Sequence, residues 1–235
     1  MLGIIGAMDM EIEGLLARMT GVSARQIGYT KFYLGALEGL PVCLARCGVG
    51  KVHAALCAQA MLLSLGATEI LNIGVAGALR DSLAVGDLVI AESAVQHDMD
   101  TTPVGDPLGL ISGPNLVHLP CDAALTALLE KATEAAGLRA QRAAVATGDQ
   151  FIAALEKKDF LAASFNAAAC DMEGGAIAQA CYEMGAPYAA CRAISDTRRG
   201  DGREYLLKAR EACQAEERLL AAFLPLYRKE REENG

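Results

Sequence analysis

The chain has 235 residues, of which 53% are hydrophobic and 21% charged, so it can bury a substantial core and is not expected to be disordered. Its formal net charge of −8 argues against a nucleic-acid partner, which would call for a basic surface, and gives no attraction to an anionic membrane. A small molecule is therefore the expected ligand.

Strand-like and helix-like segments alternate along the sequence, and Pro225 is expected to end the last helix. In chain order we expect strand Leu2–Ile5, helix Asp9–Met19, a hairpin of strands Phe32–Ala36 and Val42–Ala45, helix Lys51–Leu65, strands Ile70–Val75 and Leu88–Val95, helix Leu125–Ala135, strands Arg142–Ala146 and Ala167–Asp171, helix Gly175–Glu183, strand Tyr188–Ile194 and helix Glu204–Leu224. This alternation predicts a single α/β domain over residues 1–227, with helices on both faces of a sheet, and a charged solvated tail at 228–235.

The eight cysteines contain no C-x-x-C pair, and we recognise no signal peptide before Asp9 and Glu11. We therefore expect a cytoplasmic protein whose cysteines act as small core side chains. The longest apolar stretch, Val52–Leu65, contains polar residues and is too short to cross a bilayer. The irregular segment Gln96–Pro120, rich in proline and glycine, is expected to be a loop beside a site.

Two short motifs carry little weight. Gly48-Val49-Gly50-Lys51 resembles part of a phosphate-binding loop, but Val52 stands where serine or threonine belongs. His97-Asp98-x-Asp100 lacks the histidine spacing of a zinc site, so no metal site is expected.

Three carboxylates follow predicted strands, and this is the pattern that points to chemistry. Glu11 follows Leu2–Ile5, Glu173 follows Ala167–Asp171, and Asp196 follows Tyr188–Ile194. Each alone is explained as a helix-start or turn residue. Open α/β sheets, however, bind ligands outside the carboxyl ends of their strands, so three acids delivered to that edge can meet in one pocket.

A series of motifs in register then gives a resemblance to a known family. The motifs are Gly3-Ile4-Ile5-Gly6-Ala7-Met8-x-x-Glu11, Gly48-Val49-Gly50-Lys51-Val52, Asn72-Ile73-Gly74-Val75-Ala76-Gly77, Val85-Gly86-Asp87-Leu88-Val89, Gly148-Asp149-x-Phe151-Ile152, Asp171-Met172-Glu173 and Arg192-Ala193-Ile194-Ser195-Asp196. Over about residues 3–225 this order resembles 5′-methylthioadenosine/S-adenosylhomocysteine nucleosidases, within the purine nucleoside phosphorylase superfamily. The resemblance implies a nucleoside phosphorylase-like, three-layer αβα fold with a central mixed, partly barrel-like sheet.

The resemblance also implies roles for the three acids in cleaving a nucleoside C–N bond. Glu11 would deprotonate the attacking water, Asp196 with Ser195 would assist protonation of adenine N7, and Glu173 would accept hydrogen bonds from the ribose hydroxyls. Because an acid must carry a proton, we expect desolvation to raise the pKa of Asp196. The other implied substrate-binding residues are Met172 on the sugar, Phe151 stacked on adenine, the Ile152 backbone at its edge, and Met8, Val49, Val75, Ala76, Gly77 and Arg192. No cofactor is implied.

The superfamily contains both hydrolases and phosphorylases. Phosphate as nucleophile needs arginine or backbone donors, and a carboxylate beside it would repel it. Glu11 lies on the nucleophile side. Phosphorylases of the superfamily bring an arginine shortly before the segment that begins at Asn72, whereas Leu71-Asn72-Ile73 offers none, and Val75 replaces the usual small hydroxyl residue. These features favour water over phosphate as the nucleophile. A phosphorylase is the alternative, and a catalytically silent nucleoside-binding module is a third hypothesis that retention of all three acids argues against.

The sequence departs from the family around the expected 5′ pocket. Thr101–Val104 and residues 197–203 lack the usual aromatics, Tyr205 is the only nearby aromatic, and Asp171 stands where glutamate is usual. Arg198, Arg199 and Arg203 either meet a carboxylate-bearing 5′ tail or form a solvated turn balanced by Asp201 and Glu204. The resemblance further implies a homodimer, with Val52–Leu65 and Gln96–Pro120 as interface candidates.

Overall fold

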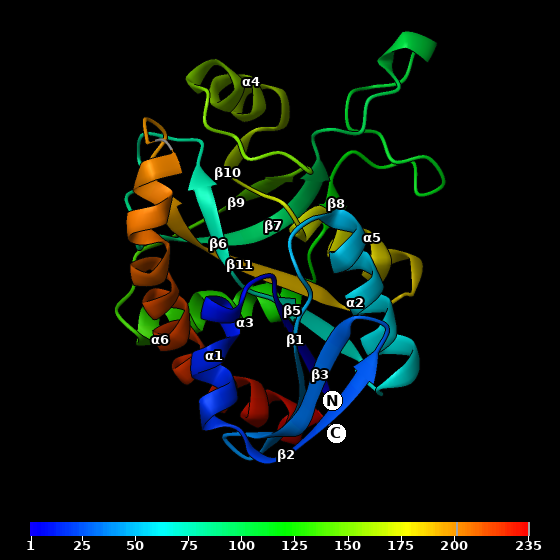
Figure 1. Ribbon diagram of the computed structural model, residues 1–235, viewed down its shortest axis with the longest axis vertical. Coiled ribbons are helices and arrows are strands. Elements are labelled where there is room, and N and C mark those ends of the chain that lie inside the picture. The colour runs from blue at the N-terminus through cyan, green and yellow to red at the C-terminus, as the bar shows by residue number, and fades with distance from the viewer. Residues whose placement is uncertain (201, 235) are drawn as a thin grey trace.

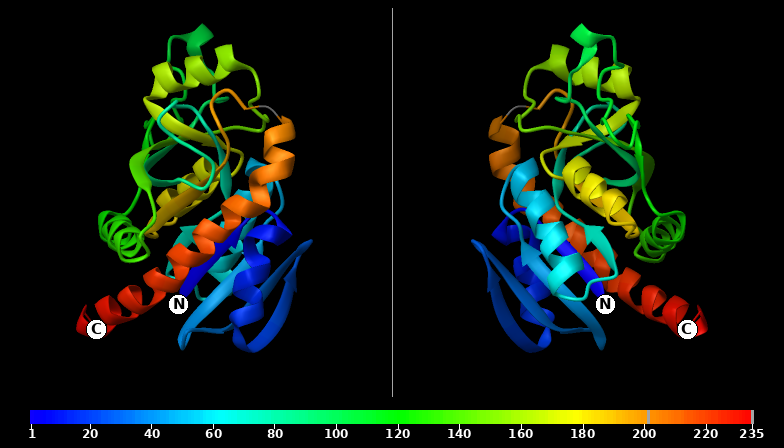
Figure 2. Two further views of the ribbon diagram at one scale, coloured as in Figure 1. Left: turned by 90° about the vertical axis from the view of Figure 1, so that its left-hand side faces the viewer. Right: turned by 90° about the vertical axis from the view of Figure 1, so that its right-hand side faces the viewer.

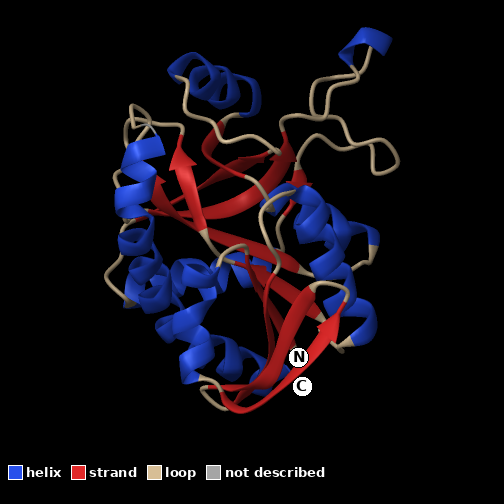
Figure 3. Cartoon of the chain, in the orientation of Figure 1, coloured by secondary structure: helices blue, strands red, loops and turns tan. Residues whose placement is uncertain are grey.

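The computed structural model describes residues 1–200 and 202–234, and its strands and helices alternate along the chain (Figures 1 and 3). The strands are β1 (Leu2–Gly6), β2 (Thr20–Ile27), β3 (Thr30–Leu37), β4 (Leu40–Arg46), β5 (Glu69–Asn72), β6 (Val75–Ala78), β7 (Leu88–Gln96), β8 (Leu119–Pro120), β9 (Ala140–Thr147), β10 (Ala167–Asp171) and β11 (Tyr188–Asp196). The helices are α1 (Asp9–Arg18), α2 (Lys51–Ser64), the short 3-10 helix η1 (Thr102–Val104), α3 (Ala123–Ala135), α4 (Leu155–Phe165), α5 (Gly174–Glu183) and α6 (Gly202–Asn234).

One mixed sheet of eleven strands runs through the described residues, in the order β2-β3-β4-β1-β5-β11-β6-β10-β9-β7-β8. Strands β4, β1, β5 and β11 are parallel, and β2, β3 and β4 form an antiparallel meander. The long strand β11 also pairs with β7, which closes β11, β6, β10, β9 and β7 into a ring. The predicted mixed, partly barrel-like sheet of a single α/β domain is confirmed.

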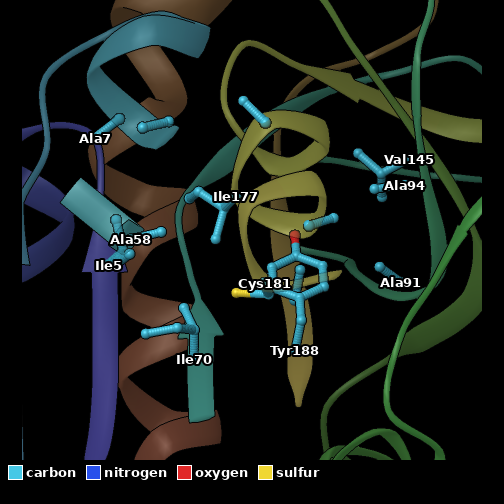
Figure 4. Close-up of a cluster of buried hydrophobic side chains, with 14 of the residues drawn as sticks. Ile5, Ala7, Ala58, Ile70, Ala91, Ala94, Val145, Ile177, Cys181 and Tyr188 are labelled. Atoms are coloured by element: carbon cyan, nitrogen blue, oxygen red, sulfur yellow. The ribbon is translucent and has the colours of Figure 1, made fainter. Parts of the chain in front are cut away.

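Helices cover both faces of this sheet, which confirms the predicted three layers. Helices α2 and α5 lie on one side and α1, α3 and α6 on the other, as the two views of Figure 2 show. Alternate residues of β1 face opposite layers, because successive side chains of a strand point to opposite faces. Ile5 belongs to the cluster with α2 and α5, drawn in Figure 4, whereas Leu2 and Ile4 belong to the cluster with α1 and α6.

The hairpin prediction is correct but incomplete. Strands β3 and β4 pair antiparallel across the turn at Glu38 and Gly39, as expected, and β2 adds a third strand on the outside. Most of β2 is exposed, so it lacks the buried alternation that reveals a strand in a sequence.

The single strand predicted at Ile70–Val75 is wrong, because the chain forms β5 and β6 with a break at Ile73 and Gly74. Gly74 has φ +141°, a conformation that favours glycine. A Cβ atom at this position would lie 2.7 Å from Oε1 of Glu11. The break therefore makes room for a carboxylate against the backbone.

Helix α4 was not predicted from the sequence, because its buried face is small and includes a charged residue, Lys158. Its buried residues are Lys158, Leu161 and Phe165, which share one face of the helix at spacings of three and four. A lysine at a core-facing position hides the apolar periodicity that marks a helix.

The prediction that Pro225 ends the last helix is wrong, since α6 continues through Pro225 to Asn234. Proline removes one backbone donor, but Pro225 is exposed, so water can satisfy the carbonyl left unpaired. Beyond it, Tyr227 and Arg231 both bond to the buried carboxylate of Glu69, which holds this part of the helix to the sheet. The boundary between domain and tail at residue 227 stays a prediction.

Residues 96–120 are largely irregular, as expected, with only η1, β8 and an isolated bridge between Ile111 and Leu116. Figure 1 shows much of this segment extending away from the sheet. No helix among the described residues is long and apolar enough to cross a membrane.

Candidate active site

The three acids singled out in the sequence line one cavity of about 200 Å³. Glu11 reaches it from the first turn of α1, Glu173 from the start of α5, and Asp196 from the end of β11. Because β1, β10 and β11 each deliver one acid at their carboxyl ends, the cavity lies where open α/β sheets bind ligands. Its lining residues are Ala7, Met8, Glu11, Val49, Val75, Ala76, Gly77, Gln150, Phe151, Ile152, Cys170, Asp171, Met172, Glu173, Ser195, Asp196 and Tyr205.

Backbone donors hold the carboxylate of Glu11. Its Oε2 accepts hydrogen bonds from Ala7 N at 2.6 Å and Met8 N at 2.9 Å, and its Oε1 accepts one from Val75 N at 3.0 Å. Burial raises the pKa of Glu11 above its usual range, although these donors and the charge of Arg192 act in the opposite direction. Glu11 is thus a first-turn helix residue, as its position alone suggested, and also a carboxylate that backbone donors hold in the wall of the cavity.

Glu173 lies at the N-cap of α5, and its Oε1 accepts a hydrogen bond from Gly50 N at 2.8 Å. This bond crosses from the loop before α2 to the end of β10. Burial, with the nearby charge of Asp171 as the second cause, raises the pKa of Glu173 to about 7. The site therefore contains a carboxyl group close to half-protonated at neutral pH before any ligand binds.

This shift predicts how stability depends on pH. Between pH 4.5 and 7 folded Glu173 keeps a proton that the unfolded chain has lost, so its contribution to stability is lost as pH rises through this window. We expect the free energy of unfolding of ligand-free protein, relative to Glu173→Gln, to fall by roughly 3 kcal/mol between pH 4.5 and 8. Urea titrations of both proteins measure it, and a difference that does not change with pH would contradict the expectation.

Asp196 is held from two sides. Ser195 Oγ lies 3.0 Å from its Oδ1, and the ammonium of Lys158 donates to its Oδ2 at 2.9 Å. Lys158 comes from α4, the helix that the sequence analysis missed, and is the most important site residue it overlooked. The available signal was Leu161 and Phe165, which place Lys158 on the core side of a helix.

The hypothesis about Asp196 considered burial alone. Burial disfavours an ionised carboxylate, but an ammonium in direct contact favours it. The structure therefore places a counterion, Lys158, beside Asp196 that the sequence did not reveal. Protonation of Asp196 by desolvation stays a prediction.

Apolar side chains form the other walls. Met8, Val49, Val75, Ala76, Gly77, Ile152 and Met172 all line the cavity, as does Phe151, whose ring is half-exposed. Phe151 meets Tyr205 of α6 edge to face, with ring centroids 5.3 Å apart, and the Tyr205 hydroxyl lies 3.3 Å from Met8 Sδ. Such a surface suits a flat aromatic base and an apolar substituent.

Arg192 is the exception among the predicted substrate-binding residues, and that prediction is corrected. Its side chain is buried behind the cavity and does not line it. It donates to Asp171 Oδ2 at 2.7 Å and to Asn72 Oδ1, while Asp171 also accepts from Gly174 N at 3.0 Å. Arg192 therefore fixes the beginning of α5, which carries Glu173.

The arginines after Asp196 are engaged with the protein. Arg198 pairs with Asp81 and Asp159, and Arg199 lies 3.7 Å from Asp81. Glu204 accepts hydrogen bonds from Thr197, and Asp201 lies outside the described residues, so the balance of the arginines by these two acids stays a prediction. Neither Arg198 nor Arg199 lines the cavity.

The His-Asp-x-Asp motif is also occupied within the protein. Asp98 pairs with Lys51 at 2.6 Å and accepts from Asp149 N, and His97 packs against Gly148. Within residues 1–200 and 202–234 no group of three or more histidine, cysteine or acidic side chains is arranged to hold a metal ion.

Comparisons with known proteins agree with this fold. The family model described as the phosphorylase superfamily matches residues 1–225, and the chain belongs to this superfamily. More particularly, the chain is 35% identical over 214 residues to a 5′-methylthioadenosine/S-adenosylhomocysteine nucleosidase of Shewanella denitrificans, covering 88% of this chain and 93% of that protein.

Solved structures give the same result. Futalosine hydrolase of Helicobacter pylori superposes with a TM-score of 0.90 at 30% identity, covering 95% of this chain and 97% of the other. The S-adenosylhomocysteine nucleosidase of Streptococcus pyogenes, in complex with 5-methylthiotubericidin, has a TM-score of 0.90 at 33% identity, covering 95% of each chain. The family resemblance predicted from the sequence motifs is confirmed.

Proposed function

We propose that this protein is an N-glycosyl hydrolase that cleaves adenine from 5′-methylthioadenosine and S-adenosylhomocysteine, releasing the 5′-substituted ribose. The similar nucleosidases and the similar futalosine hydrolase support this activity. We include 5′-deoxyadenosine and aminofutalosine as further candidate substrates, because Met8 and Tyr205, the lining residues we assign to the 5′ group, are uncharged and so do not select one 5′ substituent.

The main observation in favour of hydrolysis over phosphorolysis is that the cavity lining contains acidic but no basic side chains among the described residues. Its lining includes the carboxyl groups of Glu11, Asp171, Glu173 and Asp196, and among the described residues no lysine, arginine or histidine lines it. A phosphate dianion would meet carboxyl groups and no cationic side chain on the cavity surface, whereas neutral water needs only a hydrogen-bond acceptor. Water is therefore the nucleophile that this cavity favours.

In the proposed mechanism two acids act on opposite sides of the ribosyl group. As the C–N bond breaks, positive charge develops on the sugar and negative charge on the leaving base. Glu11, held by three backbone donors, accepts a proton from the attacking water, and Asp196 passes a proton to N7 of the base. Each of these proton transfers is expected to contribute about 10²–10⁴ in rate.

The other residues position the substrate. Glu173, in its ionised form, accepts hydrogen bonds from the ribose hydroxyls, because its two oxygens offer several acceptor positions. Phe151 stacks on the base, the Ile152 backbone meets its edge, Met172 packs on the sugar, and Tyr205 with Met8 contacts the 5′ group. Binding of ionised Glu173 to the hydroxyls would lower its raised pKa.

One assay tests the function. Purified protein is incubated with 5′-methylthioadenosine, S-adenosylhomocysteine, aminofutalosine and inosine, each with and without inorganic phosphate. We expect adenine and the free 5′-substituted ribose from the adenine nucleosides, at a rate independent of phosphate. A pentose 1-phosphate product would instead establish a phosphorylase, and absence of adenine with enzyme in excess would leave a binding module.

We also propose that the protein is a homodimer in the cytoplasm. Helix α2 exposes Val52 and Leu56, which line a groove shared with α5, and Leu63 further along the helix, and exposed apolar side chains of this kind are typical of an interface. A reducing compartment fits the eight cysteines, which are all free thiols. Sedimentation equilibrium measures the state, and a monomer at micromolar concentration would refute the dimer.

A further inference from the structure

Lys158 is a lysine with no contact to solvent. Its side chain is 0% exposed, and its ammonium donates to Asp196 Oδ2 at 2.9 Å, to Thr197 O at 2.9 Å and to Gly200 O at 3.2 Å. A lysine ammonium has three protons, and all three have an acceptor here. A buried charge is costly unless it is paired and hydrogen-bonded, so this environment is built around the ammonium form.

Asp196 is surrounded by donors. Lys158 donates to one of its oxygens, and the hydroxyl of Ser195 lies 3.0 Å from the other. The Ser195 hydroxyl, which has one proton, also lies 3.2 Å from the carbonyl oxygen of Ala76, so the ammonium of Lys158 is the donor that is committed to Asp196. A donor in direct contact favours a carboxylate without a proton of its own. Lys158, directly behind Asp196, then holds an acidic proton in hydrogen-bond contact with the Asp196 carboxylate.

We propose that Lys158 and Asp196 form one acid, in which Lys158 is the source of the proton and Asp196 passes it to the leaving purine. This inference rests on the proposed N-glycosyl hydrolase function and identifies how its leaving group is protonated. Lys158 does not line the cavity, so it acts only through Asp196.

The proton balance is complete without another reactant. When the bond between ribose C1′ and N9 breaks, its electron pair stays with the purine. A Lys158 N–H proton moves to Asp196, and a proton from Asp196 forms the N7–H bond, which leaves Asp196 a carboxylate and Lys158 a neutral amine. The oxygen of water bonds to C1′, and its proton goes to Glu11. After product release, Glu11 returns that proton to solvent, and solvent protonates Asp196, which passes the proton back to Lys158 and restores the ammonium.

Several other titratable groups lie near the pair. Glu11 and Glu173 line the same cavity, but in the proposed mechanism they face the attacking water and the ribose hydroxyls rather than the leaving base. Cys170 of β10 lies close enough to feel the charges of both members of the pair, and burial raises the pKa of its thiol to about 12. Glu204 of α6 is bonded to Thr197, and Tyr205 faces the cavity mouth. On α4 itself, Asp159 is paired with Arg198.

The test is the pH dependence of Lys158→Met with 5′-methylthioadenosine. We expect kcat to fall by at least about 10², with KM changed far less, because a proton-transfer group is lost rather than a binding contact. The alkaline limb of kcat/KM should move to lower pH by at least about two units, since the proton must then reside on a carboxylic acid instead of an ammonium. If Lys158 merely favoured ionisation of Asp196, removing it would move this limb to higher pH, and that result would overturn the proposal.

A second substrate separates proton supply from folding. A 4-nitrophenyl leaving group on the same 5-methylthioribose departs as an anion and needs no proton. We expect Lys158→Met to cleave it within about threefold of the wild-type rate. Equal losses on both substrates would overturn the proposal.

Two lysine substitutions complete the design. Lys158→Arg keeps a positive charge that cannot be given up, so it should be as defective on the nucleoside as Lys158→Met, and full activity would refute proton supply. Lys157→Met changes the adjacent lysine, whose ammonium lies over Phe160, and should match the wild type. If wild-type protein releases no adenine, the proposed function fails; if it does so and Lys158→Met is unaffected, only this inference fails.

Discussion

Replacing Glu11 by glutamine should reduce turnover of 5′-methylthioadenosine by at least about 10², while adenine still binds. Glutamine has nearly the same shape, but an amide does not accept a proton from water. It also has only one acceptor oxygen, whereas the two oxygens of Glu11 accept from Ala7, Met8 and Val75. One set of backbone donors will therefore face the amide NH₂, and a modest loss of stability should accompany the loss of turnover.

Adenine release measured by chromatography, together with adenine binding by calorimetry, checks this result. Glu13→Gln is the matched control, because Glu13 lies on the same helix but is exposed and pairs with Arg210. Turnover should be unchanged in the control. An unchanged rate in Glu11→Gln would remove Glu11 from the mechanism.

Replacing Asp196 by asparagine should lower both activity and stability. Turnover should fall by about 10²–10⁴, because the base loses the group that passes it a proton. The free energy of unfolding should fall by about 3–5 kcal/mol, since the buried ammonium of Lys158 loses its counterion and an uncompensated buried charge is strongly destabilising.

The double variant Asp196→Asn with Lys158→Met distinguishes the two effects. Removing both charges should restore most of the lost stability, as replacement of a whole buried pair by apolar groups often does, while turnover stays low. Asp159→Asn, which loses a half-exposed pair with Arg198, should cost less than about 1 kcal/mol. Urea unfolding measures all three, and a single Asp196→Asn variant as stable as wild type would contradict a buried ion pair.

The pH dependence of the ligand-free protein affects how the Glu11→Gln and Asp196→Asn variants are compared with the wild type. Because Glu173 lies near Glu11 in the same cavity and has its pKa raised to about 7, a change at one acid alters the charge seen by the other. Activity and stability of the variants are therefore compared across pH rather than at one value.

The sequence by itself determined the alternating α/β organisation and the meeting of the acids. Both follow from local chemistry: the alternating side chains of β1 bury on two faces, and parallel strands end at one edge of the sheet. Glu11, Glu173 and Asp196 could thus be expected in one cavity before their distances were known. The resemblance of the motifs to a known family then indicated that the ligand is an adenine nucleoside.

Only the tertiary structure decided what lies behind these acids. Lys158 and Asp196 are 38 residues apart, and Arg192 and Asp171 are 21 apart, so neither pairing has a local pattern. A lysine is normally expected to be solvated. Burial of Lys158 becomes favourable only because the fold supplies a carboxylate partner, Asp196, from a different element of the structure. For the same reason α4 was missed and Arg192 was assigned to the substrate. The charge state of a buried group depends on neighbours that folding brings together.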